Sequence, residues 1–316
     1  MRERILFNVL QVAVVLAFAP LASGVLARLK EMVQSKRGPS IFQPYRDLWK
    51  LSHKDEIVSE DSSWIFRFTP YIVFVTPIFV ALLIPVLTSY PLFFAFMGDM
   101  LGAGFVLALG GFFAALAAID TANPYGPMGA SRTRMVGFLA EPVFMIVFFT
   151  VSFVAGSTIP YIVQQKWVTP FANFFAPSHV LLVLAFVMLM LAEGGRIPVD
   201  NPSGHFELAM IDESKSLEYS GRGFALMKWG GQMKFFVLLC VFLNVLLTPW
   251  GLAAQQTYPA VLLAIPLVLL KVFCFLLVLV VIESSLSKLR LFRIAEFLGA
   301  AFITSVAAMI AQVFLP

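Results

Sequence analysis

Long apolar stretches alternate with shorter polar stretches along the whole chain. A helix needs about 20 apolar residues to cross a lipid bilayer. Eight stretches reach this length, near residues 5–27, 68–90, 99–119, 136–156, 172–193, 233–252, 258–283 and 294–315. The fifth is the weakest, because its apolar core is short and ends at Glu193. The pattern predicts an all-α polytopic membrane protein, a single transmembrane domain over residues 1–316 built as a bundle of eight membrane-spanning helices.

Composition supports a membrane protein and argues against several other classes. Hydrophobic residues make up 60% of the chain and charged residues 13%, whereas charged residues make up about a quarter of a soluble domain. The net charge of +4 does not indicate nucleic-acid binding, because the basic residues lie in short loops between apolar stretches. No phosphate-binding loop, dinucleotide fingerprint or nucleophile motif is present, so we expect the chain to catalyse no reaction alone.

Cysteine and histidine do not indicate a metal site. Cys240 and Cys274 are the only cysteines, and both lie inside apolar stretches without a paired spacing. His53, His179 and His205 are far apart in the sequence and lack ligand spacing. We therefore expect no metal, cluster or other cofactor in this chain.

The distribution of Lys and Arg predicts the orientation in the membrane. Basic loops stay cytoplasmic, and residues 28–67 hold eight basic residues, 121–135 two, 194–232 four and 288–293 three. The opposite side holds only Arg2, Arg4 and Lys166, so both termini are expected to be non-cytoplasmic. A basic start before an apolar stretch also resembles a signal peptide. This stretch is long for a signal, however, and far more basic residues follow it than precede it.

The first predicted cytoplasmic loop has an amphipathic pattern. After Pro44, the segment places Tyr45, Leu48, Trp49 and Leu51 so that part of it has an apolar helical face. A short helix lying on the membrane surface fits this pattern. A solvated basic loop does not explain the aromatic and leucine content.

The densest run of charge, residues 193–221, follows directly on the fifth apolar stretch. Ionisable groups are costly at membrane depth unless they pair or line a water-filled path. Asn201 followed by Pro202 is a favourable helix start. This start predicts a polar helix that carries Glu207, Asp212 and Glu213.

Several ionisable residues lie within or at the ends of the apolar stretches. They are Asp120, Glu141, Glu193, Lys271, Glu283 and Glu296. Burial favours the neutral form of such a group, and a nearby opposite charge restores the charged form. Groups balanced in this way take up and release protons, so the set predicts a proton relay. Glu141 and Lys271 are its most strongly indicated members, because they lie in mid-span.

Each of these groups also has a purely structural interpretation. Glu193 and Arg196 are three residues apart and suit a salt bridge at a helix end. Glu283 and Glu296 lie near the membrane boundaries, where their side chains are expected to reach solvent and to have no role. Asp120 either takes part in the relay or caps the loop that follows it.

Two loop motifs resemble a known family of membrane proteins. Glu193, Arg196, Pro198, Asp200 and Glu207, followed by Glu218-Tyr219-Ser220-Gly221, resemble the loop between the fifth and sixth helices of the complex I subunit 1 family. Lys36-Arg37-Gly38-Pro39, with Gln43-Pro44, Asp47, Lys50 and Leu51, resembles the first cytoplasmic loop of that family. The resemblance covers nearly the whole chain, including the eight apolar stretches.

Shorter motifs resemble the branch of this family found in membrane-bound nickel–iron hydrogenases. They are Gln43 to Asp47, Phe66 to Tyr71, Asp120-Thr121, Gly129 to Arg132, Glu141-Pro142, Ala155 to Thr158 and Met227 to Gly230. The respiratory dehydrogenase branch has a different segment where this chain has Asp120 to Pro127. That difference favours the hydrogenase branch over a quinone reductase.

The resemblance implies a subunit of the inner (cytoplasmic) membrane that links a soluble electron-transfer arm to antiporter-like proton-pumping subunits. The large and small soluble subunits would carry the nickel–iron centre and iron–sulfur clusters. The relay would comprise Asp120, Glu141, Glu193, Asp200, Glu207, Glu213, Glu218 and Lys271. The surface that faces the soluble arm would include Arg37, Gly38, Pro39, Asp47, Lys50, Arg132, Arg196 and Arg222.

Two other functions remain open. The chain departs from the family pattern at Ser203 and His205, where respiratory members often have acids. One alternative is a quinone-binding subunit of an NADH or ferredoxin dehydrogenase, whose large subunit would lack the cysteine pairs that hold nickel. The other is a stand-alone secondary transporter. It is the weakest of the three, because such folds usually show internal repeats and broken helices, which the sequence does not indicate.

Overall fold

The computed structural model describes residues 2–60, 62–95, 98–121, 123–168, 176–200 and 211–314. Seven of the described helices are long and apolar enough to cross a membrane: α1 (Arg2–Val33), α3 (Trp64–Leu83), α4 (Met100–Asp120), α5 (Tyr125–Ala155), α8 (Gly221–Val241) with its π-helical extension η4 (Phe242–Leu247), α9 (Tyr258–Ser285) and α10 (Leu291–Phe314). The shorter helices are α2 (Gln43–Ser52), α6 (Pro160–Val168), α7 (Pro177–Glu193) and the 3-10 helix η3 (Glu213–Ser216).

The all-helical prediction is confirmed over the described residues. Seven of the eight predicted spans correspond to helices of spanning length. The remaining one, 172–193, contains α7, which has 17 residues and is the shorter apolar helix. Both α5 and α8 begin well before the predicted starts at 136 and 233, because their first turns carry polar residues that precede the apolar stretch.

Helix α3 ends at Leu83, earlier than the predicted boundary at residue 90. Ile84 is extended, with φ −99° and ψ 155°, as is usual for a residue that precedes proline. The segment from Ile84 to Thr88 is nevertheless buried. Irregular backbone inside a membrane domain needs a partner for each polar group.

Side chains from three helices supply partners for this buried segment. The Nε2 of Gln11 and the hydroxyl of Tyr161 donate to the carbonyl of Ile84 over 2.9 and 3.0 Å. The Nδ2 of Asn244 donates to the carbonyl of Pro85 over 3.0 Å. The segment is therefore fixed between α1, α6 and η4.

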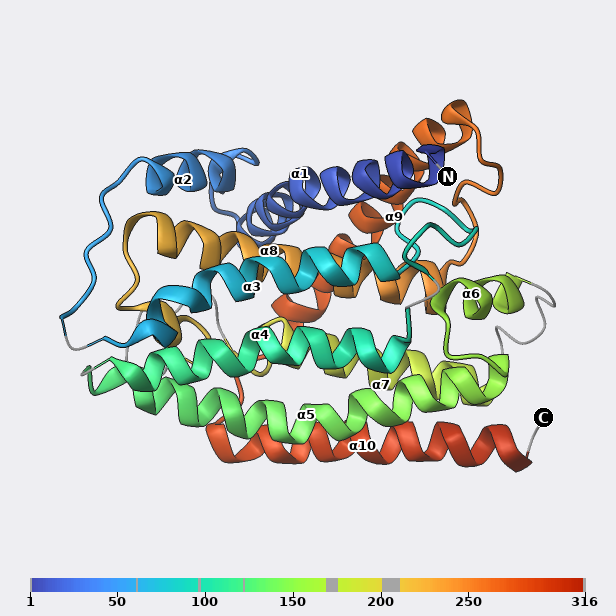
Figure 1. Ribbon diagram of the computed structural model, residues 1–316. Helices are drawn as coiled ribbons and strands as arrows, with labels where there is room; N and C mark the ends of the chain where they lie inside the picture. Colours follow the sequence, from blue (N-terminus) through green and yellow to red (C-terminus); the bar gives the residue numbers. More distant parts are fainter. Residues whose placement is uncertain are drawn as a thin grey trace.

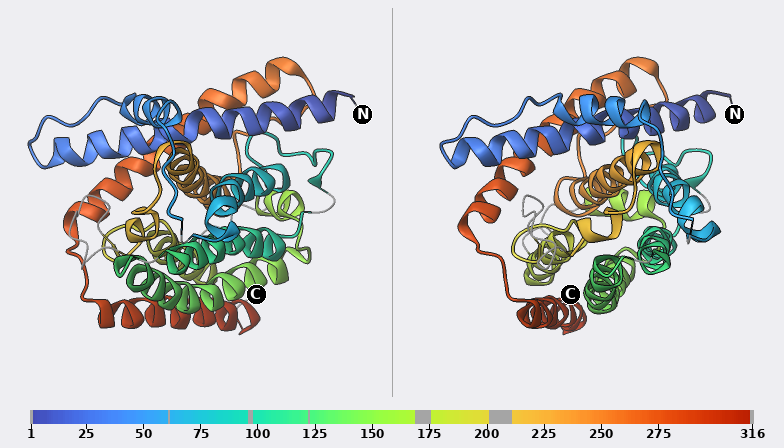
Figure 2. Two further views of the ribbon diagram at one scale, coloured as in Figure 1. Left: turned by 60° about the vertical axis from the view of Figure 1, so that its left-hand side comes forward. Right: turned by 90° about the vertical axis from the view of Figure 1, so that its left-hand side faces the viewer.

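Helix α8 is the central helix of the bundle. In α8 with η4, 78% of the most apolar stretch is buried, compared with 22–44% in the other six spanning helices. It packs against α1, α2 and α3, while α3 also packs against α4, and α4 against α5. Helix α10 packs against α5 and α7, and α9 packs against α1. The views in Figures 1 and 2 show these helices surrounding α8.

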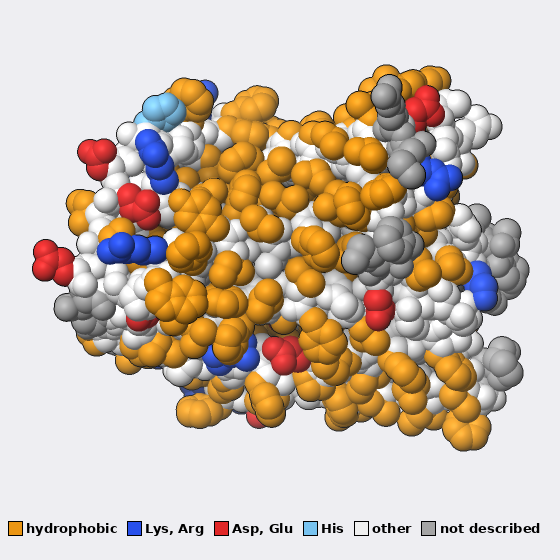
Figure 3. Space-filling view, in the orientation of Figure 1, with side chains coloured by type: hydrophobic (Ala, Val, Ile, Leu, Met, Phe, Trp, Pro, Cys, Tyr) orange, Lys and Arg blue, Asp and Glu red, His pale blue; other side chains and the backbone are white. Residues whose placement is uncertain are grey.

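The first residues of α1 and the last residues of α10 lie at the same end of the bundle (Figure 1). The opposite end, called the charged end below, carries residues 34–60, 194–200, 211–220 and 286–290 (Figures 1 and 2). Between the two ends, hydrophobic side chains cover most of the visible surface (Figure 3). That the charged end faces the cytoplasm stays a prediction.

The two predicted loop helices have different outcomes. The amphipathic helix after Pro44 is confirmed as α2, which buries Leu48 and packs on α1 and α8. The polar helix predicted after Pro202 is wrong at Asp212 and Glu213. Asp212 lies in a bend, and Glu213 begins the short η3. The earlier part of that predicted helix, with Glu207, lies outside the described residues.

Candidate functional site

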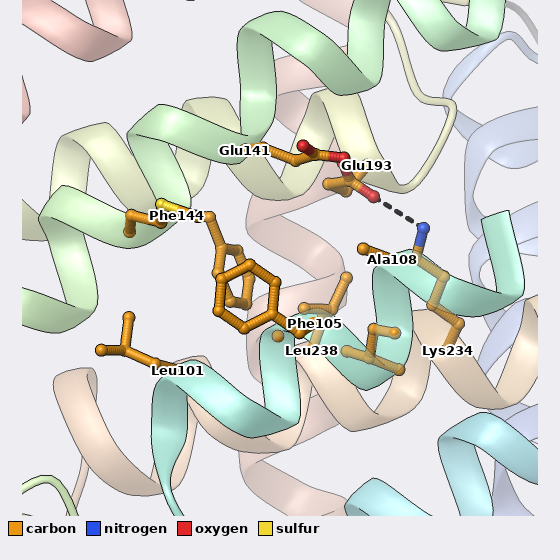
Figure 4. A pocket seen from close by; sticks show the side chains of 11 residues that line it. Leu101, Phe105, Ala108, Glu141, Phe144, Glu193, Lys234 and Leu238 are labelled. Atoms are coloured by element: carbon orange, nitrogen blue, oxygen red, sulfur yellow. Dashed lines mark hydrogen bonds and ion pairs between the residues drawn. The ribbon is translucent and has the colours of Figure 1, made fainter. Parts of the chain in front are cut away.

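Two adjoining cavities lie between α4, α5, α7 and α8. They share Ala108, Glu141, Glu193 and Lys234. Figure 4 shows Glu141 on α5, Glu193 at the end of α7 and Lys234 on α8 beside this shared space. Two carboxylates and one ammonium therefore lie where the cavities meet.

The two cavities differ in polarity. Apart from the shared residues, the first is lined by Leu101, Gly104, Phe105, Leu107, Phe144, Met145 and Leu238. The second extends toward the charged end, and its lining includes Thr133, Arg134, Asp200, Asp212 and Lys215. The shared residues thus join an apolar space inside the bundle to a polar space at its charged end.

Helical spacing brings the α5 residues of this site together. Thr133, Gly137, Glu141 and Phe144 are three or four positions apart, so they lie along one side of the helix, and each lines a cavity. At Gly137 an added Cβ would meet no atom within 4 Å. The backbone of α5 therefore leaves open space beside Glu141.

Glu193 is paired with a residue that the sequence did not single out. The Nζ of Lys234 lies 2.6 Å from Oε2 of Glu193, and the two side chains are 26% and 23% exposed. A charge-assisted hydrogen bond of this length is among the stronger kinds. The structural alternative predicted for Glu193, a salt bridge with Arg196, is wrong.

Asp212 and Lys215 form a second pair at the edge of the polar cavity. The Nζ of Lys215 lies 2.5 Å from Oδ1 of Asp212. The positive charge of Lys215 is the main cause that holds the pKa of Asp212 below its ordinary value, and the charges of Lys234 and Arg196 act in the same direction. Asp212 thus remains ionised beside the Glu193 pair.

Glu141 differs from these carboxylates because no residue in the described part of the chain gives it a charged partner. Its side chain is half-buried and lines both cavities. Among the residues that the structure describes, none forms a hydrogen bond or an ion pair with the Glu141 carboxylate. Glu141 is therefore suited to exchange a proton within the cavity.

Asp200 fixes the loop that closes the polar cavity. Its carboxylate is almost fully buried, and Oδ1 lies 2.7 Å from Nζ of Lys288. Its Oδ2 accepts hydrogen bonds from the backbone nitrogens of Ile211 and Asp212 over 3.2 and 3.0 Å. Asp200 therefore ties together the two described ends of the loop between α7 and α8 (194–200 and 211–220), called the central loop below, and connects them to the segment just before α10.

Glu283 does not reach solvent, so that prediction is wrong. Its side chain is 0% exposed, and Oε2 lies 2.9 Å from Nζ of Lys30, while Oε1 lies 3.9 Å from Nη1 of Arg196. Burial lowers the pKa of Arg196, and the charges of Glu283 and Asp212 oppose that effect. The three side chains form a buried triad between α1, α9 and the central loop. Glu296, in contrast, is exposed as predicted.

The Glu218-to-Gly221 motif holds the loops of the charged end together at the predicted interface. The ring of Tyr219 stacks on Phe66 at 4.0 Å, and its hydroxyl donates to the Phe66 carbonyl over 2.9 Å. The Oγ of Ser220 accepts from the backbone nitrogen of Ile57 over 2.8 Å and donates to its carbonyl over 3.1 Å. Glu218 is exposed and accepts a hydrogen bond from Asn123.

The structure brings three predicted relay residues, Glu141, Glu193 and Asp200, to the cavities. Others lie elsewhere. Asp120 accepts from the backbone nitrogen of Ser63 over 2.7 Å, at the start of α3. The Nζ of Lys271 donates to the carbonyls of Thr248, over 2.8 Å, and Trp250. Glu213 and Glu218 are exposed, and Glu207 lies outside the described residues.

The predicted interface residues differ in their exposure to solvent. Those exposed are Arg37, Pro39, Lys50 and Arg222, and those partly buried are Gly38, Asp47 and Arg132. Arg196 is directed into the protein: its side chain is 16% exposed and its Cζ lies 4.6 Å from the centre of the Phe235 ring. Arg196 therefore contributes to the interior electrostatics more than to an outer surface.

The sequence reasoning missed the basic partners Lys30, Lys234 and Lys288. Lys234 is the second residue of the predicted span 233–252. A position so near the edge of a span does not indicate an interior residue. Because α8 begins at Gly221, Lys234 is well inside the helix, and the rule that singled out Lys271 applies to it too. Over the described residues, no group of three His, Cys, Asp or Glu side chains is arranged to hold a metal ion.

Comparison with known proteins identifies one family match and two relatives of similar length. The family model described as NADH dehydrogenase matches residues 5–314. The chain is 34% identical to formate hydrogenlyase subunit 4 of Escherichia coli (strain K12) over 289 residues, which cover 91% of this chain and 92% of the relative. It is 32% identical to hydrogenase-4 component C of the same strain over 291 residues, with 90% and 89% covered.

A solved structure shares the fold. It is titled as the membrane-bound sulfane sulfur reductase, an archaeal respiratory membrane complex, and one of its chains superposes with a TM-score of 0.82 at 18% identity. The superposition covers 97% of this chain and 98% of that chain. The family match over residues 5–314 and the two relatives at 34% and 32% identity place the chain in the NADH dehydrogenase subunit 1 family.

Proposed function

We propose that this protein is the membrane-anchor and proton-coupling subunit of a membrane-bound hydrogenase complex of the formate hydrogenlyase type. The observation that carries the proposal is the pair of joined cavities, which lead from Glu141 inside the bundle to the charged end. The names of the two relatives that are 34% and 32% identical support the hydrogenase assignment.

In this proposal the charged end lies on the cytoplasmic side of the inner membrane. It meets the large and small soluble subunits, which carry the nickel–iron centre and iron–sulfur clusters. The exposed basic residues Arg37 and Arg222 lie on this end and supply the charge for docking. Antiporter-like membrane subunits receive the protons that leave the cavities.

Coupling follows from how closely the charged groups interact. Asp212 is affected electrostatically by Lys215, Lys234 and Arg196, and Lys234 also binds Glu193. A change of charge in the soluble arm near Asp212 therefore alters the field at Lys234. Because opposite charges within about 4–6 Å stabilise each other's ionised forms, Glu193 then gains or loses preference for a proton, which Glu141 exchanges across the shared space.

The hydrogenase assignment is tested by purifying the native complex from membranes through a tag on this chain. We expect a soluble large subunit with bound nickel, together with iron–sulfur partners and hydrogen evolution. A complex without nickel that reduces quinone would contradict the proposal and support the quinone-binding alternative. Purification of the chain as a solitary, transport-active protein would contradict both.

A further inference from the structure

One side of α2 carries aromatic and basic side chains that the rest of the described chain leaves uncovered. Trp49 is 70% exposed and Phe42 is 59% exposed. Arg46 and Lys50 are exposed as well. Arg46 lies four residues after Phe42, three before Trp49 and four before Lys50. At this spacing the four side chains lie on neighbouring parts of one helical side. We call this surface the α2 face.

The opposite side of α2 fixes its depth along α1. The hydroxyl of Tyr45 donates to the carbonyl of Ala17, and an added Cβ on Gly24 would lie 2.1 Å from the carbonyl oxygen of Ile41. Helix α2 therefore packs along α1, and Figures 1 and 2 show it beside that helix at the charged end of the bundle.

The charge of this region is strongly one-sided. Arg28, Lys36 and Arg37, on the last turns of α1 and just beyond it, are exposed. The nearest acid on α2, Asp47, is partly buried and accepts a hydrogen bond from Nε2 of Gln43 over 2.8 Å. The α2 face thus presents positive charge without an acidic residue of its own.

Aromatic rings beside basic residues match the chemistry of the membrane boundary. Tryptophan is enriched at the level of lipid headgroups, and basic residues close to the surface attract anionic lipids. A helix that lies in this plane places its aromatic side chains at the edge of the acyl region and its basic side chains among the phosphates. Helix α2 lies at the charged end of the bundle (Figure 1), which places the α2 face at this boundary.

We propose that the α2 face, formed by Phe42, Arg46, Trp49 and Lys50, binds the headgroups of anionic phospholipids. The two rings contact the acyl boundary, and the guanidinium and ammonium groups contact lipid phosphates. This assigns Lys50 to the membrane and not to the soluble arm. The inference does not rest on the proposed hydrogenase function, because it requires only the membrane domain and its surface.

Fluorescence quenching of Trp49 tests the assignment. The full chain is placed in nanodiscs of phosphatidylcholine with a fixed minor fraction of phosphatidylglycerol, and bromine is carried by either lipid in turn. Subtraction of the Trp49→Phe spectrum isolates Trp49 from the other four tryptophans. Because each basic residue near the surface enriches anionic lipid by roughly fivefold, brominated phosphatidylglycerol should quench Trp49 at least about twofold more per lipid than brominated phosphatidylcholine.

The basic residues are tested with a matched control. The double variant Arg46→Gln with Lys50→Gln should remove the preference for brominated phosphatidylglycerol, while Arg222→Gln, an exposed basic residue on another helix, should retain it. Equal quenching by both lipids in the parent chain would overturn the proposal, as would a lack of quenching by either lipid. The latter result would place the α2 face in water or under a protein partner.

Discussion

The Nζ of Lys234 lies 2.6 Å from Oε2 of Glu193, which sets an ammonium of the central helix against the last residue of α7. Glu141 lines the same space and has no such partner among the described residues. The site therefore combines a charge-paired carboxylate with an unpaired one.

Replacing Lys234 with methionine should leave Glu193 without its counter-charge and shift Glu193 to the protonated form. We expect a new carboxylic-acid band in the infrared spectrum of Lys234→Met that disappears in Lys234→Met with Glu193→Gln. The free energy of unfolding should fall by about 1–3 kcal/mol, the usual cost of removing one partner of a buried polar pair. Lys234→Arg, which keeps the charge, should show no such band. Absence of the band in Lys234→Met would refute this assignment.

The buried triad predicts a large stability effect at Glu283. Its removal in Glu283→Ala leaves Lys30 and Arg196 without the carboxylate that both contact. Breaking a buried ion pair by deleting one partner costs about 3–5 kcal/mol. Unfolding in mixed detergent micelles should show this loss, whereas Glu296→Ala, at an exposed position of α10, should change the free energy by less than about 0.5 kcal/mol. Equal effects of the two substitutions would contradict the triad.

Several features of the fold and site were predictable from local sequence patterns. Apolar length gave the seven spanning helices, and the spacing of Tyr45, Leu48 and Trp49 gave α2. The cost of charge at membrane depth directed attention to Glu141 and Glu193, which the structure places beside the shared space. Each of these inferences depends only on neighbours along the chain.

The pairing of charges was not predictable in the same way. Lys288 and Asp200 are 88 residues apart, and their contact depends on how α10 is placed beside the central loop. Helical periodicity identifies neighbours three or four positions apart, so it suggested Arg196 as the partner of Glu193. The packing of α7 against α8 brings Lys234 there instead. Tertiary packing, which one sequence does not display, therefore decides which acids are neutralised.

Gly221 is predicted to be essential for the junction between the loop that follows α2 and the start of α8. Its φ is +49°, and an added Cβ would lie 2.6 Å from the carbonyl oxygen of Asp55. Gly221→Ala should therefore cost about 2 kcal/mol or more, from backbone strain together with the clash. Gly231→Ala is the matched control in the same helix, because its Cβ would meet no atom within 4 Å. The control should be neutral or stabilising by up to about 1 kcal/mol, and a neutral Gly221→Ala would contradict the geometry.

Lys271 is predicted to act mainly as a structural cation. Its Nζ donates to the carbonyls of Thr248 and Trp250 and to Oδ1 of Asn244, so each of its three protons has an acceptor. Lys271→Met should lower the free energy of unfolding by about 1–3 kcal/mol, with the ratio of protons translocated to hydrogen formed unchanged in the assembled complex. A selective loss of translocation would instead support the relay role that its mid-span position suggested.

The most direct test of proton coupling is the number of protons translocated per hydrogen formed by the Glu141→Gln complex in inverted membrane vesicles. Hydrogen evolution in the presence of an uncoupler serves to establish that the complex has assembled, and Glu296→Gln provides a control at an exposed glutamate. The account predicts that the ratio falls toward zero in Glu141→Gln, because the proton path through the cavities loses its exchangeable carboxyl group, and stays at the parent value in Glu296→Gln. If the Glu141→Gln complex translocated as many protons per hydrogen formed as the parent complex, proton coupling through Glu141 would be contradicted.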